Sequence, residues 1–215
     1  MPELIHISSP GAPVFFGEPG NPLVVVIHDW YGRLPALESF AQSLASEGLR
    51  VAVPDLYNGV ATTDPDDAAA LMGGLDVGIS LAEIDDVIAD ARAQGSAKVG
   101  VVGFSIGGWL ALLHAQGGAA DAVVAYYASL GPNDHGVIPA PVLLHFAETD
   151  EWGPGEEPEI FIERLKEHGT PVTEHVYIDT VHSFANGSVD EKSNRRAAEL
   201  ARARTQSFLA MHLID

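Results

Sequence analysis

A strand, a tight turn and a helix follow one another in residues 98–116, which read KVGVVGFSIGGWLALLHAQ. The apolar run Lys98–Val102 predicts a buried strand, and the small and apolar residues of Ile106–Gln116 predict a helix. Between them lies the pattern G-x-S-x-G, centred on Ser105. At a strand-to-helix turn this pattern is typical of a nucleophile elbow, in which the serine hydroxyl is exposed and the amide of Ile106 points toward a developing oxyanion. The alternative is an ordinary turn at which Ser105 caps the helix.

Further strands and helices alternate on both sides of this motif. The β-branched run Leu23–Ile27 is typical of a strand that is covered on both faces. The other predicted strands are Arg50–Val53, Ala122–Tyr126, Pro141–Phe146 and Val172–Ile178, with Val14–Phe16 as an edge strand. The other predicted helices are Leu34–Glu47, Ala68–Met72, Ile79–Ala93, Pro158–His168 and Asp190–His212. The alternation predicts an α/β fold with a mostly parallel sheet. Because no repeat, linker or change of composition divides the chain, we expect residues 1–215 to form one domain.

The charge of the chain restricts the partners that it binds. Eleven Lys and Arg residues stand against thirty Asp and Glu residues, a formal net charge of −19. Such a surface repels polyphosphates, so we expect neither nucleic-acid binding nor docking on anionic membranes. Cysteine is absent, which excludes disulfides, thiolate metal sites and a cysteine nucleophile. No signal peptide and no membrane-spanning apolar run are evident, so a cytoplasmic location is predicted.

Two candidate partners for Ser105, an acid and a histidine, come later in the chain. A serine hydroxyl needs a base to accept its proton, and the base needs a carboxylate to orient it. Asp150 follows the apolar strand PVLLHF and His182 follows the strand VTEHVYI, in the order Ser, acid, His that is typical of hydrolases with a nucleophile elbow. Alone, a loop Asp is usually a turn residue and a loop His a surface residue. If the strands are parallel, however, all three side chains meet at one edge of the sheet.

Five segments strengthen this interpretation because they match one known family in the same order. They are VVVIHDWYG, VPDLYNG, GFSIGG, LLHFAETDEW and VHSFAN, at residues 24–32, 53–59, 103–108, 143–152 and 181–186. Together they resemble the dienelactone hydrolase family of α/β hydrolases, from about Val24 to Leu209. The resemblance implies a triad of Ser105, Asp150 and His182, with the Ile106 and Trp30 amides as the oxyanion hole. It also implies the opening of small unsaturated lactones without a metal or organic cofactor.

The chain departs from the family pattern at three positions. Ser105 stands where the best-known members have cysteine. Asp29 stands where those members have a glutamate that activates the cysteine, so we expect only a supporting role for it. Asn186 replaces an arginine that helps to bind the substrate carboxylate, and residues 61–84, where a second arginine is expected, contain no Lys or Arg. We therefore expect neutral lactones or esters to be hydrolysed faster than carboxylated ones.

Four more residues lie near the predicted site in the sequence. Tyr57 and Tyr127 follow strands, where each either lines the pocket or packs in the core. Arg33 either contacts an anionic substrate or is an ordinary surface arginine. His28 is interpreted as a strand-end residue, and no metal site is predicted, because no second close-spaced group of His and Asp accompanies the His28-Asp29 pair.

These observations lead to one functional hypothesis with two alternatives. We expect a cofactor-independent serine hydrolase, a monomer or small homo-oligomer, that cleaves a small ester or lactone through an acyl-enzyme. The segment between Ser105 and Asp150 has room only for a helix, two strands and a loop, so no separate cap domain is expected there. A general carboxylesterase or thioesterase is the first alternative, and a non-catalytic binding module on the same scaffold is the second.

Overall fold

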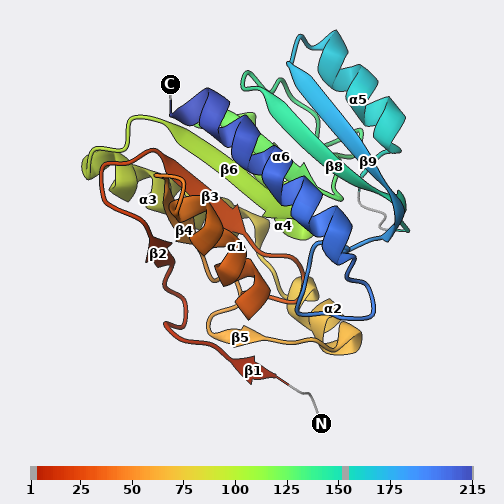
Figure 1. Ribbon diagram of the computed structural model, residues 1–215, viewed down its shortest axis with the longest axis horizontal. Helices are drawn as coiled ribbons and strands as arrows, with labels where there is room; N and C mark the ends of the chain where they lie inside the picture. Colours follow the sequence, from red (N-terminus) through yellow and green to blue (C-terminus); the bar gives the residue numbers. More distant parts are fainter. Residues whose placement is uncertain (1–3, 152–154, 215) are drawn as a thin grey trace.

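A seven-stranded sheet forms the centre of the molecule (Figure 1). The computed structural model describes residues 4–151 and 155–214. The strands of the sheet are β2 (Val14–Phe16), β3 (Leu23–Ile27), β4 (Arg50–Val53), β6 (Val99–Phe104), β7 (Ala122–Tyr126), β8 (Val142–Thr149) and β9 (Val172–Val181). Their order is β2-β4-β3-β6-β7-β8-β9, and each neighbouring pair is parallel except β2 and β4, which are antiparallel. The short strands β1 (Ile5–His6) and β5 (Val60–Ala61) form a separate antiparallel pair.

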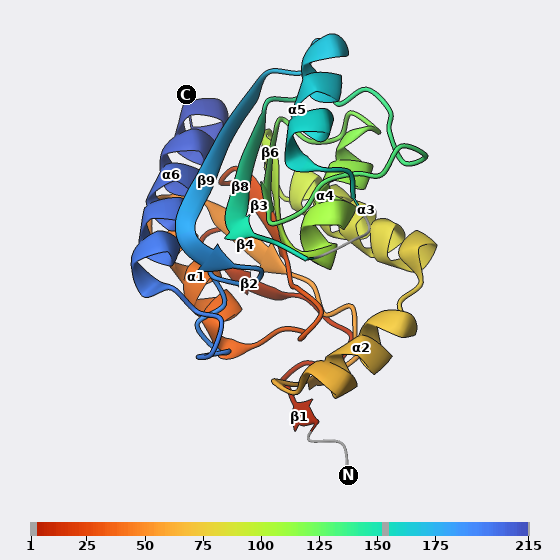
Figure 2. The same cartoon turned by 90° about the vertical axis from the view of Figure 1, so that its right-hand side faces the viewer.

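Helices cover both faces of the sheet (Figure 2). They are α1 (Pro35–Ala45), α2 (Pro65–Gly73), α3 (Val77–Ala93), α4 (Ile106–Ala115), α5 (Pro158–Glu167) and α6 (Arg195–Leu213). One face of the sheet is covered by α1 and α6, and the other by α3, α4 and α5. Helix α2 lies outside these layers, near β5. The predicted α/β class, with a mostly parallel sheet between two layers of helices, is confirmed.

Alternate side chains of the central strands supply the two halves of the core. In β3, Leu23, Val25 and Ile27 pack on the side of α3 and α4, whereas Val24 and Val26 pack on the side of α1 and α6. All five side chains are fully buried. Each such burial stabilises the fold by about 1.5–3 kcal/mol, which is why a continuous apolar run marks a strand enclosed by helices.

The sequence-based boundaries differ from the observed ones at several elements. Strands β8 and β9 are longer than predicted, and the pair β1 and β5 was not predicted at all. Helix α6 begins at Arg195 rather than Asp190, because the side chain of Asn194 caps it by accepting a hydrogen bond from the backbone N–H of Ala197 at 3.1 Å. Helix α3 begins earlier than predicted for the same kind of reason, with Asp76 as its N-cap.

The chain between Ser105 and Asp150 forms α4, β7, β8 and their connecting loops, so no cap domain is inserted there. A single sheet that draws strands from β2 to β9 agrees with one domain, although the extent 1–215 stays a prediction. In the two described ranges, no helix combines the length and the apolar character needed to cross a bilayer.

Candidate active site

The turn between β6 and α4 holds Ser105 in a strained backbone conformation. Its φ of 56° and ψ of −118° lie outside the regions that non-glycine residues usually adopt. Two glycines make this turn possible, because a Cβ on Gly103 would collide with the backbone of Gly107, and a Cβ on Gly107 with the backbone of His28. The G-x-S-x-G pattern therefore marks a point where strand and helix backbones pass too close for side chains. Strain of this kind is typical of functional sites.

Two hydrogen bonds join Ser105, His182 and Asp150 in a row. Oγ of Ser105 lies 2.8 Å from Nε2 of His182, and Nδ1 of His182 lies 2.7 Å from Oδ1 of Asp150. A carboxylate at Nδ1 favours the tautomer that carries its proton there, so that Nε2 accepts a proton from the serine. The arrangement has the geometry of a nucleophile, a base and the acid that orients the base.

The ends of three parallel strands bring this row together. Ser105 follows β6, Asp150 follows β8 and His182 follows β9, each without an intervening loop. Residues 147–149, between the predicted strand Pro141–Phe146 and Asp150, form the end of β8, which pairs with the end of β9. Tyr127, which follows β7, is fully buried, and its ring centroid lies 4.9 Å from that of the His182 imidazole. Tyr127 therefore packs in the core beside His182, and its role in binding substrate stays a prediction.

The two expected oxyanion donors belong to the start of α4 and to the segment after β3. Ile106 is the first residue of α4, so its N–H has no acceptor within the helix. Trp30 lies in the segment after β3, the strand that pairs with β6. The side chain of Trp30 lines the same hollow as Ser105 and His182. That both amides form an oxyanion hole stays a prediction.

An open hollow of about 530 Å³ lies in front of Ser105. It is lined by Trp30, Met72, Ser105, Thr149, Glu151, Val181, His182 and Lys192. Met72 belongs to α2, and Lys192 to the segment between β9 and α6. The Nζ atom of Lys192 lies 5.6 Å from the centre of the Trp30 ring. The sequence did not single out Met72, Glu151 and Lys192. Met72 and Lys192 lie outside the quoted family segments, and Glu151 lies within one of them but is overshadowed by its neighbour Asp150.

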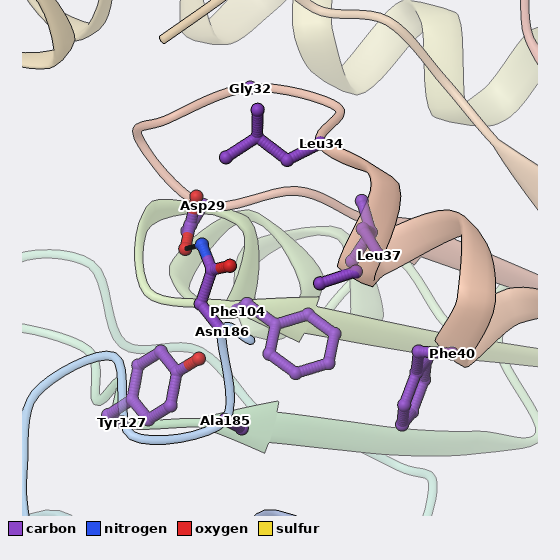
Figure 3. Close-up of a pocket in the computed structure, with 10 residues that line it drawn as sticks. Asp29, Gly32, Leu34, Leu37, Phe40, Phe104, Tyr127, Ala185 and Asn186 are labelled. Carbon is purple, nitrogen blue, oxygen red and sulfur yellow. Dashed lines mark hydrogen bonds between the residues drawn. The ribbon is translucent and has the colours of Figure 1, made fainter. Parts of the chain in front are cut away.

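A second, smaller hollow of about 30 Å³ lies beside Asp29 and Asn186 (Figure 3). Apolar side chains surround it, namely Leu34, Leu37, Phe40 and Phe104, and Tyr127 also lines it. Oδ2 of Asp29 accepts a hydrogen bond from Nδ2 of Asn186 at 2.8 Å. Burial raises the pKa of the Asp29 carboxyl to about 6, although this bond opposes the effect. Asn186 thus contacts Asp29, and it does not line the open hollow in front of Ser105.

The interpretation of Arg33 as an ordinary surface arginine is wrong. Its side chain is only 1 % exposed, and its guanidinium donates hydrogen bonds to the carbonyl oxygens of Ala12 at 2.9 Å and Val53 at 3.3 Å, and to that of Ser8. Oε1 of Glu38 lies 3.6 Å from Nε of Arg33. A buried arginine needs such acceptors because an unpaired charge is costly in the interior. Arg33 therefore holds the N-terminal segment against the sheet, and it does not line the hollow in front of Ser105. A contact with substrate stays a prediction.

Tyr57 and His28 pack together behind the site. Their ring centroids are 4.7 Å apart, both side chains are buried, and neither lines the hollow in front of Ser105. Nε2 of His28 accepts a hydrogen bond from the N–H of Leu56 at 3.2 Å, and burial lowers the pKa of His28 to about 4. Tyr57 is thus a packing residue, and His28 is a strand-end residue. Within the described parts of the chain, no group of three or more His, Cys, Asp or Glu side chains is arranged to hold a metal ion.

Comparisons with known proteins agree with this geometry. The chain is 31 % identical over 214 residues to a putative carboxymethylenebutenolidase of Azospirillum brasilense, covering 89 % of this chain and 88 % of that protein. It is 29 % identical over 204 residues to the carboxymethylenebutenolidase of Pseudomonas putida, covering 88 % and 85 %. The structure of a putative dienelactone hydrolase from Klebsiella pneumoniae subsp. pneumoniae MGH 78578 superimposes with a TM-score of 0.77 at 20 % identity, covering 97 % of this chain and 99 % of that one.

A profile of the dienelactone hydrolase family matches residues 13–213, nearly the whole chain. A dienelactone hydrolase-like promiscuous phosphotriesterase from metagenomic libraries shares the fold, with a TM-score of 0.80 at 19 % identity over 93 % of this chain and 92 % of that one. The resemblance noted in five short segments therefore extends over nearly the whole sequence and includes the fold. The chain belongs to the dienelactone hydrolase family and is a hydrolase of ester or lactone bonds.

Proposed function

We propose that the protein is a cofactor-independent serine hydrolase that cleaves a small ester or lactone through an acyl-enzyme formed on Ser105. The observation that carries this proposal is the row of hydrogen bonds from Oγ of Ser105 through His182 to Asp150, at 2.8 and 2.7 Å. No cysteine exists in the chain to serve as the nucleophile. The strained turn at Ser105 supports the same role, because a purely structural serine has no need of it.

The reaction follows from the positions of these groups. Oγ of Ser105 attacks the carbonyl carbon while Nε2 of His182 takes the hydroxyl proton, and Asp150 stabilises the imidazolium that forms. The negative charge on the carbonyl oxygen is stabilised by the amides of Ile106 and Trp30. Collapse of this intermediate breaks the ester bond, and the leaving alkoxide receives the proton from His182. Water then attacks the acyl group, again with His182 as the base, and Ser105 regains its proton.

The size of the hollow in front of Ser105 favours a small substrate. Its volume of about 530 Å³ suits a small molecule, and it is open to solvent. The names of the relatives, carboxymethylenebutenolidases, point to a lactone as the first substrate class to test. Apolar side chains of Trp30, Met72 and Val181 on the wall also suit a short acyl chain, which favours a general carboxylesterase as the second candidate. Comparing lactones with acyclic esters of equal size separates the two.

The test is covalent labelling with a fluorophosphonate probe. We expect one label, located by peptide mass on Ser105, and Ser105→Ala should lose both the label and about 10³-fold or more of the ester hydrolysis rate. Ser46→Ala is the matched control, since Ser46 is exposed at the end of α1, far along the chain from the elbow. Full turnover by Ser105→Ala would overturn the proposal. Unchanged labelling of that variant would show a different nucleophile.

A further inference from the structure

We propose that Asp29 and Asn186 form a positioning pair that ties the loop carrying the oxyanion donor to the loop carrying the base. The first is the Trp30 loop, residues 28–34, and the second is the histidine loop, residues 182–188. The inference rests on the proposed function, in which Trp30 supplies an oxyanion donor and His182 is the base. Neither Asp29 nor Asn186 touches the acyl group in this scheme, so both act through other residues.

The contacts of the pair span both loops. Oδ1 of Asp29 accepts a hydrogen bond from the N–H of Tyr31 at 3.0 Å, within the Trp30 loop. Oδ2 of the same carboxylate accepts from Nδ2 of Asn186 at 2.8 Å, in the histidine loop (Figure 3). Oδ1 of Asn186 in turn accepts from the N–H of Ser188 at 2.9 Å. This last bond fixes the orientation of the Asn186 amide, so that its NH₂ group must face Asp29.

The surroundings make these hydrogen bonds strong and specific. Asp29 is only 4 % exposed, and apolar side chains line the small hollow beside it. In such an environment a hydrogen bond is stronger than in water, and a lost partner is costly. The positive charge of Lys192, and that of His182 whenever the imidazole carries a second proton, favour the ionised form of Asp29, against the effect of burial. The carboxylate thus lies within the electrostatic field of the base.

Other hydrogen bonds attach the Trp30 loop to segments outside the histidine loop, and one more bond, from the N–H of Ala36 to Oγ of Ser188 at 3.2 Å, joins the histidine loop to the start of α1. At one end, His28 accepts a hydrogen bond from the N–H of Leu56. At the other end, Arg33 binds backbone carbonyls of the segment before β3 and of β4. The centre of the loop, where Trp30 lies, is held by the carboxylate of Asp29 and by the N–H of Thr62, which donates to the carbonyl oxygen of Tyr31 at 2.9 Å. Movement of Asn186 therefore changes the position of the Trp30 amide relative to Ser105.

This role explains why position 186 needs no cation. An arginine at this place in the family pattern reaches toward the substrate, whereas the shorter amide of Asn186 ends at Asp29. Asparagine offers an NH₂ donor and a carbonyl acceptor at the tip of its side chain, and both are used, by Asp29 and by the N–H of Ser188. A carboxylate at position 186 has no donor and a guanidinium has no acceptor, so neither can make the same two bonds.

An exchange of the two residues tests the pair. Asn186→Asp places two carboxylates against each other, and Asp29→Asn allows two amide NH₂ groups to face each other. The double variant D29N/N186D restores one donor and one acceptor with their places reversed, because the amide at position 29 now donates to the carboxylate at position 186. Displacing an oxyanion donor is expected to lower kcat about tenfold or more in each single variant, with KM changed less than about threefold. D29N/N186D should recover to within about threefold of the wild-type kcat.

Asp55→Asn is the matched control, because Asp55 is also a buried loop carboxylate that accepts backbone N–H groups, those of Gly11 at 2.8 Å and Gly59 at 2.6 Å. It makes no hydrogen bond to the histidine loop among the described residues. We expect this control to lower thermal stability while it leaves kcat close to the wild-type value. If the control Asp55→Asn loses as much kcat as D29N and N186D, the losses come from general destabilisation of the fold. That result would overturn the proposal.

Hydrogen exchange gives a readout that does not depend on the chemistry at Ser105. If the pair couples the loops, N186D should speed amide exchange in the peptide that covers residues 28–34, and D29N should speed it in the peptide that covers residues 182–188. Should N186D fail to fold, Asn186→Ala replaces it in both measurements. Unchanged exchange across the pair, or no recovery in the double variant, overturns the coupling. Failure of the proposed serine mechanism would instead appear as full activity of Ser105→Ala. The hydrogen-exchange result does not depend on that mechanism and would still hold.

Discussion

As the pH rises, the Asp29→Asn variant is expected to gain stability relative to the wild type, even though the substitution slows the reaction. Burial raises the pKa of Asp29 from 3.8 to about 6, while hydrogen bonds from Asn186 and Tyr31 act in the opposite direction. A group with a higher pKa in the folded than in the unfolded chain stabilises the fold only while it is protonated. That contribution is complete below the unfolded pKa and is lost as the pH rises through the folded pKa. Asn is neutral at every pH, so the variant avoids this loss.

The magnitude follows from the two pKa values. The difference between 3.8 and about 6 corresponds to about 3 kcal/mol, at about 1.4 kcal/mol for each pH unit. About 2 kcal/mol of this total falls between about pH 4.5 and about pH 8. His28 contributes the opposite dependence, because burial lowers its pKa to about 4 and its contribution is lost as the pH falls. Since His28 is present in both proteins, its effect cancels in the difference between them.

The assay is urea unfolding of the wild type and Asp29→Asn, followed by circular dichroism at several pH values. The free energy of unfolding of the variant, minus that of the wild type, should increase by about 2 kcal/mol from about pH 4.5 to about pH 8. A difference that stays constant with pH would refute the argument from burial. A difference that moves in favour of the wild type as the pH rises would show that the ionised carboxylate stabilises the fold.

The triad and the open hollow lead to three further expectations. The value of kcat/KM should fall as acid protonates the imidazole, and His182→Gln should remove this limb together with most of the activity; near-normal turnover in that variant would require another base. Exhaustive chelation and added metal should both leave activity unchanged, whereas loss that one metal restores would implicate His28 and Asp29. For a pair of substrates that differ only in a free acid or its methyl ester away from the scissile bond, we expect higher kcat/KM for the methyl ester. Lys192 lines the hollow and would attract a free acid, so a preference for the acid would contradict this expectation. Disappearance of that preference in Lys192→Met would identify Lys192 as the group that binds the acid.

The meeting of Ser105, Asp150 and His182 could be predicted because it depends on local signals. Ser105 is marked by two glycines at a close backbone approach, and Asp150 and His182 each follow an apolar strand. In a parallel sheet, strand ends meet at one edge whatever the details of the loops. The class of the fold followed from the same alternation of strands and helices.

Residues on irregular segments could not be placed in this way. Lys192 lies between β9 and α6, where no periodicity specifies the path of the chain, yet this path brings it to the hollow in front of Ser105. Arg33 was interpreted from its charge as exposed or substrate-facing, but its acceptors are backbone carbonyls contributed by distant segments. Asn186 was assigned from its position beside the histidine, and only the fold shows that its amide meets Asp29, 157 residues earlier in the chain.

The place of β9 at the edge of the sheet puts the proposed base, His182, at a weak point of the structure. β9 pairs with β8 on one side only, and it carries His182 at its end. Ser105 and Asp150 come from β6 and β8, nearer the middle of the sheet. Partial opening of an edge strand needs less free energy than global unfolding. Heat or denaturant should therefore inactivate the enzyme by detaching its base while most of the sheet is still intact, and during synthesis catalysis begins only after the final strand has docked.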